Sequence, residues 1–407
     1  MKLSFVGLGY VGLVSSICLG SKNHTIYGYD KDSKKISSLK DKNLYIDEKD
    51  LDALFSENKD MYFSESIDQN LFNSDLVFVC VDTPYDQENI LNLDNLFNAI
   101  DEIATKKVND KKLNIVIRST IPPRTIDFLA EKYNGKNLTF TSNPEFLREG
   151  NAISDFFNAE ITVIGSTDKD AIDCCSKLYE SFSSKKIVTQ PENAEMIKFV
   201  NNSYHALKIT FANEVGQICN SIGINSKDLM EIFKSDHQLN ISDKYFNPGF
   251  AYGGSCLPKD TNGLINLAKE SSINVNVLSS IEKSNRELIE RIGEKINTLE
   301  PSKILILGIT FKEGTDDLRG SPIIELAKII KNDTFYFIDE KIKVGRLDFE
   351  NNCFINIKDN FEEMDFDLCI YNYGTLSNTI SEKIEQSNFI FDLNNKLKKE
   401  KNIIQIT

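Results

Sequence analysis

The chain has 407 residues, a length typical of two or three domains rather than one. Hydrophobic residues make up 41% and charged residues 27%, which is the balance of a globular protein and argues against global disorder. The 47 Lys and Arg residues against 61 Asp and Glu residues give a net charge of −14, so an anionic partner would need a local basic patch. The sequence contains no dense Lys/Arg block, and we expect neither a nucleic acid nor a membrane as partner.

The sequence has no apolar stretch of the roughly 18 residues that a transmembrane helix needs. The N-terminus lacks the basic region and cleavage site of a signal peptide, so we expect a cytoplasmic protein. In that compartment the eight cysteines should be reduced thiols. They form no CxxC pair and the three histidines are scattered, so no metal site is expected.

The first thirty residues follow the order of a dinucleotide-binding unit. An apolar strand at 3–6 enters a glycine-rich turn at 7–12, a helical pattern follows, and a second strand at 25–29 ends at Asp30. Glycines allow the tight turn, and the helix N-terminus meets the pyrophosphate. A carboxylate at Asp30 would accept hydrogen bonds from ribose hydroxyls and repel a 2′-phosphate. The pattern therefore favours NAD over NADP, with FAD as the remaining alternative.

Further apolar runs predict buried strands at 76–81, 114–117, 138–141 and 161–164. Such runs alternating with helices indicate a parallel sheet covered on both faces. The apolar period becomes helical from about 192 to 296, and strands return at 303–308, 335–338, 368–371 and 389–391. We therefore predict an α/β protein with a Rossmann-like domain at 1–191, a central helical domain at 192–298 and a second Rossmann-like α/β domain at 299–407.

Cys256 differs from the other cysteines in its surroundings. It lies in a polar, glycine-rich segment at 249–260, where glycines allow close approach to a ligand. Lys259 would favour the thiolate, and Asp260 could position a water. A lone cysteine is more often a buried, inert side chain, but this setting favours a reactive one.

Two pairs of polar residues stand four positions apart. Glu145 and Glu149 follow the strand at 138–141, and if their segment is helical they share a face and could act as acid and base. Lys198 and Asn202 have the same spacing on the long helix that follows. Pairs of this kind are usually solvated surface, so spacing alone leaves both interpretations open.

Together these motifs resemble the UDP-glucose/GDP-mannose dehydrogenase family, which are nucleotide-sugar 6-dehydrogenases. The matching segments recur in the family's order and cover nearly the whole chain: 7–12, 82–84, 118–122, 143–150, 195–198 with Asn202, 253–260 and 311–319. The resemblance implies an N-terminal NAD domain, a helical middle that forms a homodimer or higher oligomer, and a C-terminal domain for the nucleotide-sugar.

The resemblance also implies the reaction, in which a C6 alcohol becomes a carboxylate and two NAD are consumed. Cys256 would attack the intermediate aldehyde, a second oxidation would give a thioester, and water would hydrolyse it. The implied catalytic residues are Cys256 as nucleophile, Lys198 and Asn202 as stabilisers of oxyanions, Thr120 and Asp260 as water-positioning groups, and Glu145 as general base.

The same resemblance names contacts to the two small molecules. The implied cofactor contacts are Gly7, Gly9, Tyr10, Val11, Gly12, Asp30, Lys35, Thr83, Ser119, Thr120, Glu149, Lys259 and Arg319, with Glu149 beside the nicotinamide. The implied substrate contacts are Glu145, Phe146, Leu147, Lys198, Asn202, Phe250, Tyr252, Gly253, Phe311 and Lys312.

The motifs give conflicting indications of which nucleotide-sugar is the substrate. Residues 210–214, 236–240 and 250–252 resemble GDP-mannose enzymes, whereas the compact C-terminal domain and residues 119–123 resemble bacterial UDP-glucose enzymes. Because UDP-glucose is the commoner substrate in the family, we expect oxidation of UDP-glucose to UDP-glucuronate for polysaccharide biosynthesis. GDP-mannose is the alternative, and UDP-N-acetylmannosamine ranks third.

Two alternatives belong to other functional classes. A non-catalytic nucleotide-sugar binding protein would have no need of Cys256, Lys198 and Asp260 together. A one-step hydroxyacid dehydrogenase with Lys198 as base would leave Cys256 idle. The number of NADH formed per product separates these from the four-electron enzyme.

Overall fold

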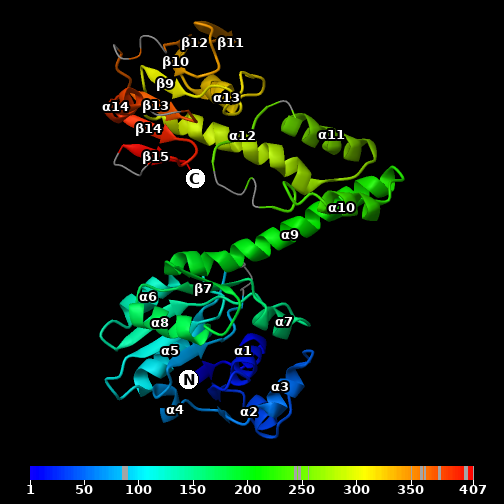
Figure 1. Cartoon of the computed structure of the whole chain (residues 1–407), viewed down its shortest axis with the longest axis vertical. Helices are drawn as coiled ribbons and strands as arrows, with labels where there is room; N and C mark the ends of the chain where they lie inside the picture. The colour runs from blue at the N-terminus through cyan, green and yellow to red at the C-terminus, as the bar shows by residue number, and fades with distance from the viewer. Residues whose placement is uncertain are drawn as a thin grey trace. The chain divides into compact units, whose positions relative to one another are not determined.

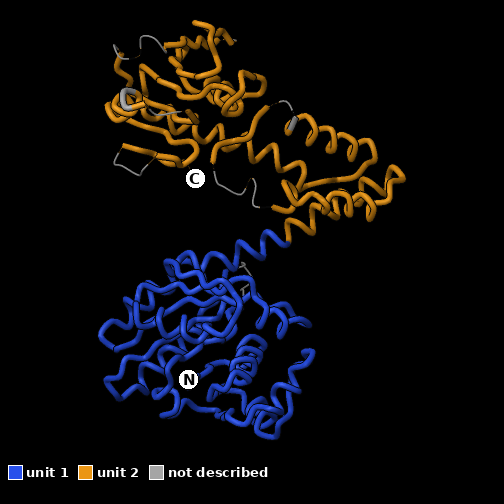
Figure 2. Tube along the Cα trace, in the orientation of Figure 1, with its two compact units in different colours: residues 1–205 blue, residues 206–407 orange. Residues whose placement is uncertain are grey.

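The computed structural model describes residues 1–84, 90–242, 245, 249–254, 256–349, 351–357, 361, 364–374, 377–397 and 402–406, and for residues 256, 378 and 379 it describes the backbone alone. The chain divides into two compact units, residues 1–205 and residues 206–407 (Figure 2). Helix α9 (Pro191–Ser221) belongs to both units, and Figure 1 shows it as one continuous helix. The division into three domains expected from the sequence stays a prediction.

A largely parallel sheet forms the centre of the first unit. Its strands are β1 (Lys2–Val6), β2 (Thr25–Tyr29), β3 (Met61–Ser64), β4 (Leu76–Val79), β5 (Leu113–Ile117), β6 (Leu138–Ser142), β7 (Ile161–Gly165) and β8 (Lys185–Thr189). Their order across the sheet is β3-β2-β1-β4-β5-β6-β7-β8. The first six have the 3-2-1-4-5-6 order of a dinucleotide-binding Rossmann fold, which confirms the predicted fold class.

One pair of strands departs from the expected parallel arrangement. β7 runs antiparallel to β6, and β8 is parallel to β7. The connection between β6 and β7 is mostly loop, and its helix α7 (Ala152–Phe157) has only six residues. Parallel crossovers usually contain a longer helix. The prediction of a wholly parallel sheet is therefore wrong at this pair.

Helices cover both faces of the first sheet. Besides α7 they are α1 (Tyr10–Gly20), α2 (Ser33–Lys40), α3 (Leu51–Glu57), α4 (Gln69–Phe72), α5 (Asp94–Lys106), α6 (Thr125–Lys132) and α8 (Lys169–Leu178). Alternate residues of β4 point into opposite cores, with Leu76 and Phe78 on one face and Val77 and Val79 on the other. This burial on both sides explains why the central strands are continuous apolar runs.

The second unit begins with helices and continues as a second α/β sheet. Its helices after α9 are α10 (Ser226–Lys234), α11 (Cys256–Glu270), α12 (Asn276–Asn297), α13 (Pro322–Ile329) and α14 (Asn378–Gln386). Its strands are β9 (Ile304–Leu307), β10 (Thr334–Ile338), β11 (Arg346–Phe349), β12 (Asn352–Asn356), β13 (Leu368–Tyr371), β14 (Phe389–Asp392) and β15 (Ile403–Gln405).

The second sheet repeats the strand order of the first. Its order is β11-β12-β10-β9-β13-β14-β15, and only β11 pairs in the antiparallel direction among the described strands. From β12 to β15 the 3-2-1-4-5-6 order recurs, so the predicted second Rossmann-like α/β sheet is confirmed. Five strands went unpredicted: β3, β8, β11, β12 and β15.

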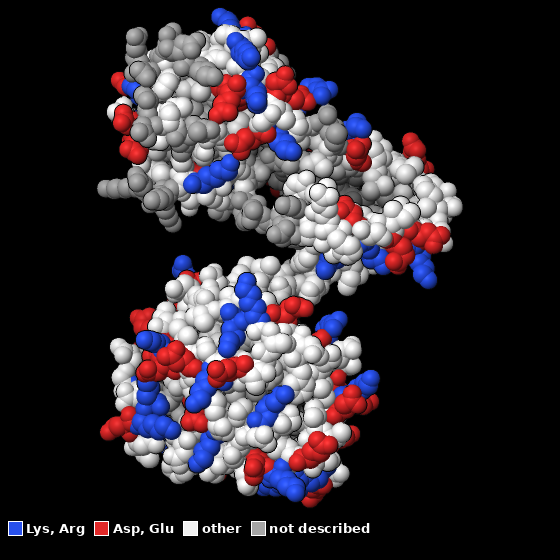
Figure 3. Space-filling view, in the orientation of Figure 1, with Lys and Arg blue, Asp and Glu red and all other residues white. Residues whose placement is uncertain are grey.

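The surface carries two features that bear on partners. No helix among the described residues is both long and apolar enough to cross a membrane. Figure 3 shows Lys and Arg interspersed with Asp and Glu on the visible face of each unit. On α9, Ala194 is buried, whereas Val200 and Ile209 are 47% and 62% exposed in the single chain.

Candidate functional site

The turn between β1 and α1 packs so closely against neighbouring atoms that two of its residues must be glycine. Gly7 has a φ of +89°, and a Cβ there would lie 2.9 Å from the Cys80 carbonyl carbon. A Cβ on Gly12 would lie 2.0 Å from the carbonyl oxygen of Gly7, because the first turn of α1 packs against the end of β1. The backbone N–H groups that begin α1 are thus held next to the strand, where they suit a pyrophosphate.

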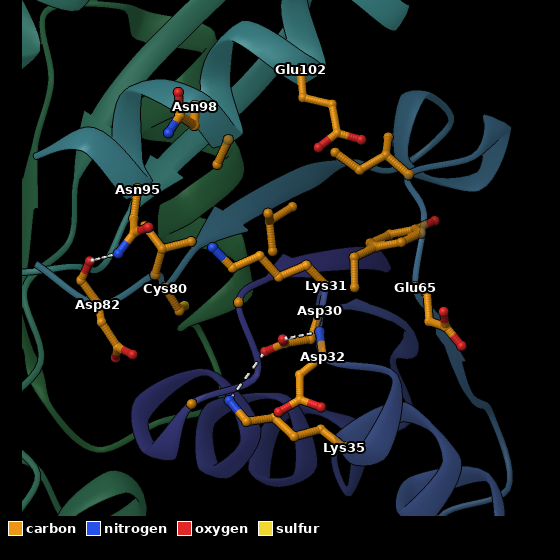
Figure 4. Close-up of a pocket in the computed structure, with 17 residues that line it drawn as sticks. Asp30, Lys31, Asp32, Lys35, Glu65, Cys80, Asp82, Asn95, Asn98 and Glu102 are labelled. Atoms are coloured by element: carbon orange, nitrogen blue, oxygen red, sulfur yellow. Dashed lines mark hydrogen bonds and ion pairs between the residues drawn. The ribbon is translucent and has the colours of Figure 1, made fainter.

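Asp30 lies at the end of β2 beside this turn (Figure 4). Its Oδ2 accepts a hydrogen bond from the Leu8 N–H at 2.8 Å, and its Oδ1 accepts one from the Asp32 N–H at 3.0 Å. Lys35 Nζ lies 3.6 Å from Asp30 Oδ2. In Figure 4 Asp30 lies between the side chains of Lys31 and Lys35.

Asp30 helps to line a cavity of about 310 Å³ together with Gly7, Gly9 and Lys35. This volume is within the usual range of ligand pockets. The glycine cradle and the carboxylate at the strand end both fit a bound NAD. Sequence reasoning missed Lys31, Asn95, Asn98 and Glu102, which also line the cavity. The last three lie on α5, far along the chain, where no local motif marks them.

The loops after β4 and β5 are tied to each other next to this cavity. Thr83 Oγ1 donates a hydrogen bond to the Thr120 carbonyl at 2.9 Å, and Ser119 Oγ donates one to the Val81 carbonyl at 2.6 Å. Three residues predicted to contact the cofactor, Thr83, Ser119 and Thr120, therefore come together at the carboxyl ends of adjacent parallel strands. Ligands of open α/β sheets bind at this edge.

Glu145 and Lys198 form an ion pair that joins the loop after β6 to helix α9. Lys198 Nζ donates to Glu145 Oε1 at 2.7 Å, and Glu145 Oε2 accepts the Leu147 N–H at 2.6 Å. Both side chains, with Thr120, line a small recess of about 10 Å³, roughly enough space for one water molecule. The structure thus brings together three of the predicted catalytic residues.

The segment 143–150 is not helical, so the condition under which Glu145 and Glu149 would share a helical face is not met. Glu145 is buried, whereas Glu149 is exposed. The side chains of Asn143 and Glu145 bond instead to backbone groups, the Val163 carbonyl and the Leu147 N–H, and fix the loop in this conformation. The two carboxylates therefore face different surroundings. Phe146 and Leu147, predicted substrate contacts, are half-buried in the same loop.

Arg118 fixes the start of this loop, a role that sequence reasoning missed. Its Nη1 donates to Asn143 Oδ1 at 2.7 Å and to the Tyr179 hydroxyl at 3.0 Å. Asn143 Nδ2 donates to the Val163 carbonyl at 2.7 Å. Burial raises the pKa of Tyr179 despite the neighbouring cation of Arg118, so the phenol stays neutral. The loop is thereby anchored to the strands on either side of it.

Glu195 holds the start of α9 in place one turn before Lys198. Its carboxylate accepts the Arg124 N–H at 2.6 Å and the Ile126 N–H at 2.7 Å, where α6 begins. Burial raises the pKa of Glu195, and these two backbone hydrogen bonds partly counteract the rise. Asn202, one turn after Lys198, is exposed on the same helix.

In the second unit the predicted substrate residues Phe250, Phe311 and Lys312 line one cavity of about 670 Å³, together with Asn394. A Cβ on Gly254 would lie 2.8 Å from the Phe311 ring, so the glycine there permits close packing. A Cβ on the adjacent Gly253 would lie 2.2 Å from the carbonyl oxygen of Gly320, a still closer approach.

Other predicted residues of this unit are fixed by pairs of their own. Tyr252 exchanges two hydrogen bonds with Asn285, its N–H donating at 3.0 Å and its carbonyl accepting at 2.9 Å. Arg319 Nη2 lies 2.7 Å from Asp317 Oδ2, and hydrogen bonds from Arg319 lower the pKa of Asp317 to about 2. Arg319 is predicted to contact the cofactor, and that assignment stays a prediction.

Cys256 begins helix α11, and its side chain lies outside the described residues. One turn later, Lys259 Nζ lies 2.8 Å from Asp260 Oδ1, and both side chains are exposed. The prediction that Cys256 and Asp260 share a site with Glu145 and Lys198 concerns residues of different units and stays a prediction. Among the described residues no group of three or more His, Cys, Asp or Glu side chains is arranged to hold a metal.

Comparison with known proteins gives two matches to family models. The NAD binding domain of the UDP-glucose/GDP-mannose dehydrogenase family matches residues 1–183, and the central domain of that family matches residues 192–287. The chain belongs to the UDP-glucose/GDP-mannose dehydrogenase family. The resemblance found in the motifs is confirmed, and NAD is the cofactor of its N-terminal domain.

Relatives within the UDP-glucose/GDP-mannose dehydrogenase family include enzymes for two substrates. A GDP-mannose 6-dehydrogenase of Pseudomonas aeruginosa is 34% identical over 372 residues, which cover 88% of this chain and 85% of the relative. A UDP-glucose 6-dehydrogenase of Rickettsia prowazekii is 37% identical over 349 residues, which cover 83% and 80%. The chain is therefore a nucleotide-sugar dehydrogenase by family.

Solved structures of family members show the same fold. A ternary complex of GDP-mannose dehydrogenase from Pseudomonas aeruginosa matches with a TM-score of 0.91 and 30% identity over 100% of both chains. A UDP-glucose dehydrogenase from Pyrobaculum islandicum matches with a TM-score of 0.55 and 26% identity, covering 91% of this chain and 89% of the other.

Proposed function

We propose that this chain oxidises the C6 hydroxyl of a nucleotide-sugar to a carboxylate through a thioester on Cys256. The observation that carries the proposal is the ion pair between Glu145 and Lys198, which lines a recess with Thr120. A protein that only bound the nucleotide-sugar would have no use for a largely buried carboxylate and ammonium at this place. The acidic product suits the biosynthesis of a surface polysaccharide.

NAD, when bound, accepts the hydride of each of the two oxidations. The residues that would hold it are those of the glycine turn, with Asp30 at the ribose, and Thr83 and Ser119 in the loops after β4 and β5. The ammonium of Lys198 would stabilise an oxyanion on the reacting carbon, assisted by the Asn202 amide. The thiolate of Cys256 would form the bond to carbon, and the exposed Asp260 would help to position water.

Glu145 would act in the last step, the hydrolysis of the thioester. A water molecule in the recess beside Thr120 would give its proton to the Glu145 carboxylate while its oxygen attacks the thioester carbon. The Cys256 thiolate would then leave. Because Glu145 is held by Lys198 and by the Leu147 N–H, its position would be set before water arrives.

The nucleotide part would bind in the cavity lined by Phe250, Phe311 and Lys312. Aromatic rings offer a surface for a base to stack on, and a lysine ammonium offers a charge for a phosphate. The volume of about 670 Å³ is in the range of small-molecule sites. Three residues that the family motifs assign to the substrate therefore lie in one cavity of a single unit.

We place GDP-mannose first among the candidate substrates and UDP-glucose second. A solved GDP-mannose dehydrogenase matches 100% of this chain at 30% identity and a curated one matches 88% of it, against 91% at 26% identity and 83% for the UDP-glucose enzymes. Residues 210–214 and 236–240 also resemble GDP-mannose enzymes. UDP-glucose stays the second candidate because its dehydrogenases reach 37% identity, and it is the substrate that family frequency favours.

The test is the yield of NADH with GDP-mannose, UDP-glucose and UDP-N-acetylmannosamine, each measured against the carboxylate formed. The expected result is two NADH per carboxylate with GDP-mannose, because an alcohol loses two hydrides on its way to the acid. Cys256→Ser should form no carboxylate yet bind NAD normally, while Cys174→Ser, a half-buried thiol on α8, should behave as the parent. One NADH per product would favour a single-step dehydrogenase, and no NADH with any sugar would favour a binding protein.

A further inference from the structure

Glu48 is a buried carboxylate that belongs to none of the motifs singled out above. It lies between α2 and α3, and only 6% of its surface is exposed. A buried carboxylate is costly unless hydrogen bonds satisfy it. The hydrogen-bond donors to Glu48 therefore identify the segments that this side chain holds together.

Three donors from two separate segments converge on the Glu48 carboxylate. The Tyr10 hydroxyl, on the first turn of α1, donates to Oε2. The Gly150 N–H donates to the same oxygen at 2.7 Å, and the Ala152 N–H donates to Oε1 at 3.0 Å. The Gly150 contact joins residues that are 102 positions apart in the chain. One side chain thus connects the glycine-rich turn with the end of the loop that carries Glu145.

The segment that carries Glu48 makes a second hydrogen bond to the glycine turn. The Tyr45 hydroxyl donates a hydrogen bond to the Leu8 carbonyl, in the middle of that turn. Lys35, which pairs with Asp30, lies 5.8 Å from the centre of the Tyr45 ring. Residues 45–48 therefore pack over the cofactor turn on one side and reach the loop at 143–150 on the other.

The loop at 143–150 is consequently fixed at both ends. Arg118 and Val163 hold its first residue, Asn143, and Glu48 holds its last, Gly150. Glu145 and Glu149 lie between these two anchors. The first anchor fixes the loop to the sheet, and the second fixes it to the turn that receives the cofactor.

We propose that Glu48 is a positioning residue that fixes the loop carrying Glu145 and Glu149 at a set distance from the NAD-binding turn. Its effect on catalysis rests on the proposed function, since it acts through Gly150 and Tyr10 and is assigned no contact with substrate. The effect on the loop stands independently of which sugar is oxidised.

The arrangement requires a carboxylate and not merely a polar side chain of that length. N–H and O–H groups point at both oxygens, so each oxygen must accept. A glutamine would present its NH₂ group to one of those donors and lose at least one hydrogen bond. The pKa of Glu48 is lowered because the hydrogen bonds from Tyr10, Gly150 and Ala152 outweigh the opposing effect of burial. The lowered pKa favours the ionised carboxylate of Glu48 in this site.

Glu48→Gln tests the proposal, with Glu214→Gln as a matched control. Glu214 is also buried at 6% exposure and accepts two backbone N–H groups, from Val277 at 2.9 Å and Leu278 at 3.0 Å. It lies in the second unit, outside the loop at 143–150. Comparing the two variants separates loss of this bridge from the general cost of disturbing a buried carboxylate.

The first measurement is backbone hydrogen exchange, read by mass spectrometry over residues 143–157. Glu48→Gln should speed exchange at Gly150 and Ala152 about tenfold or more, because hydrogen bonds to a charged acceptor are lost. Glu214→Gln should leave this segment unchanged. Tyr10→Phe removes only the contact with the turn, so exchange at Gly150 should stay within about twofold of the parent.

The second measurement is the split between kcat and KM with the nucleotide-sugar that the panel identifies. At saturating NAD, Glu48→Gln should lower kcat about tenfold or more, with a smaller change in the sugar KM. Exchange at Gly150 and Ala152 in Glu48→Gln that equals the parent's, or a kcat that equals the parent's, would overturn the proposal. Absence of turnover in the parent would refute the proposed function alone, because the exchange result does not depend on it. If Glu48→Gln does not fold, Glu48→Asp, which withdraws the carboxylate by one methylene, should give the same pattern.

Discussion

The Nζ atom of Lys198 lies 2.7 Å from Oε1 of Glu145, although the two residues are 53 positions apart in the chain. Their side chains are 15% and 10% exposed, so the pair is largely withdrawn from water. Removing one partner of such a pair leaves the other charge poorly compensated. The proposed base and the proposed oxyanion stabiliser are therefore one electrostatic unit, and a change in either should alter both.

Glu145→Gln should slow hydrolysis of the thioester more than the oxidations that precede it. An amide cannot take the proton of the attacking water, and losing a general base commonly costs about 10²–10⁴-fold in rate. Mixing the variant with substrate and excess NAD should give a burst of about two NADH per site and then a slow steady state. Intact-protein mass spectrometry should detect the acylated nucleotide-sugar on Cys256.

Glu131→Gln is the control for this experiment, because Glu131 is an exposed carboxylate on α6. It should show the parent's steady-state rate and no lasting adduct. If Glu145→Gln instead slows the first oxidation and gives neither burst nor adduct, Glu145 acts at the hydride-transfer step. Thr120 and Asp260 would then be left to direct the water.

Sequence patterns predicted the parts of this molecule that depend on local order. The predicted strand at 25–29 matches β2, and the glycine turn and Asp30 have the expected arrangement. Central strands such as β4 were visible because both of their faces are buried. The missed β8 is a strand with exposed residues, and the missed β15 has only three residues. Short or exposed strands lack the continuous apolar run that marks a buried one.

The contacts that organise the site could not be predicted in the same way. Glu48 reaches Gly150 across 102 positions, and Arg118 reaches Tyr179 across 61. Nothing near either residue in the sequence indicates its partner, because the sheet topology alone brings them together. The condition that 143–150 be helical is not met for a related reason. Asn143 and Gly150 make contacts outside the loop that hold it in an irregular conformation.

Asp30→Ala should weaken NAD binding and reduce the preference for NAD over NADP. The ribose hydroxyls would lose a charged acceptor, a loss of about 1.5–3 kcal/mol in typical cases. Lys31 and Lys35, which line the same cavity, would no longer be offset by that carboxylate, so a 2′-phosphate would be repelled less. Dissociation constants for both cofactors measure the change. Asp60→Ala, at an exposed acid outside the cavity, should leave both unaltered, and equal discrimination by parent and Asp30→Ala would show that Asp30 is not at the ribose.

The buried cysteines should react far more slowly with iodoacetamide than Cys256. Burial raises the pKa of Cys18, Cys80 and Cys175 to about 12. Because the thiolate is the reactive form, a raised pKa means less reaction, and at pH 8 only about one such thiol in 10⁴ is ionised. Their labelling should rise with pH well above 8, whereas Cys256, with Lys259 nearby in sequence, should already react at pH 7–8.

Peptide mass spectrometry after brief alkylation measures these rates one cysteine at a time. The rapidly labelled peptide should vanish in Cys256→Ser. If Cys80 is labelled first at pH 8, its position in the cofactor cavity leaves it more open than its burial indicates. The assignment of Cys256 as the activated thiol would then lose its chemical support.

The exposed apolar side chains of α9 and α10 lead us to expect a homodimer. Leu207, Ile209 and Ile232 are 49%, 62% and 73% exposed in the single chain, and burying such a side chain contributes about 1.5–3 kcal/mol. The family resemblance also assigns dimer formation to this helical region. Ile209→Asp should therefore weaken self-association at least about tenfold, because a buried unpaired carboxylate opposes it.

Sedimentation equilibrium of the parent and of Ile209→Asp tests the expected dimer. Val108→Asp is the control, since Val108 is 81% exposed between α5 and β5, outside the helical region. A parent that sediments as a monomer, or a dimer that Val108→Asp weakens as much as Ile209→Asp does, would contradict the assignment to α9. A dimer that only Ile209→Asp dissociates, with NAD affinity unchanged, would place the interface on this helix and leave the cofactor site of the first unit intact.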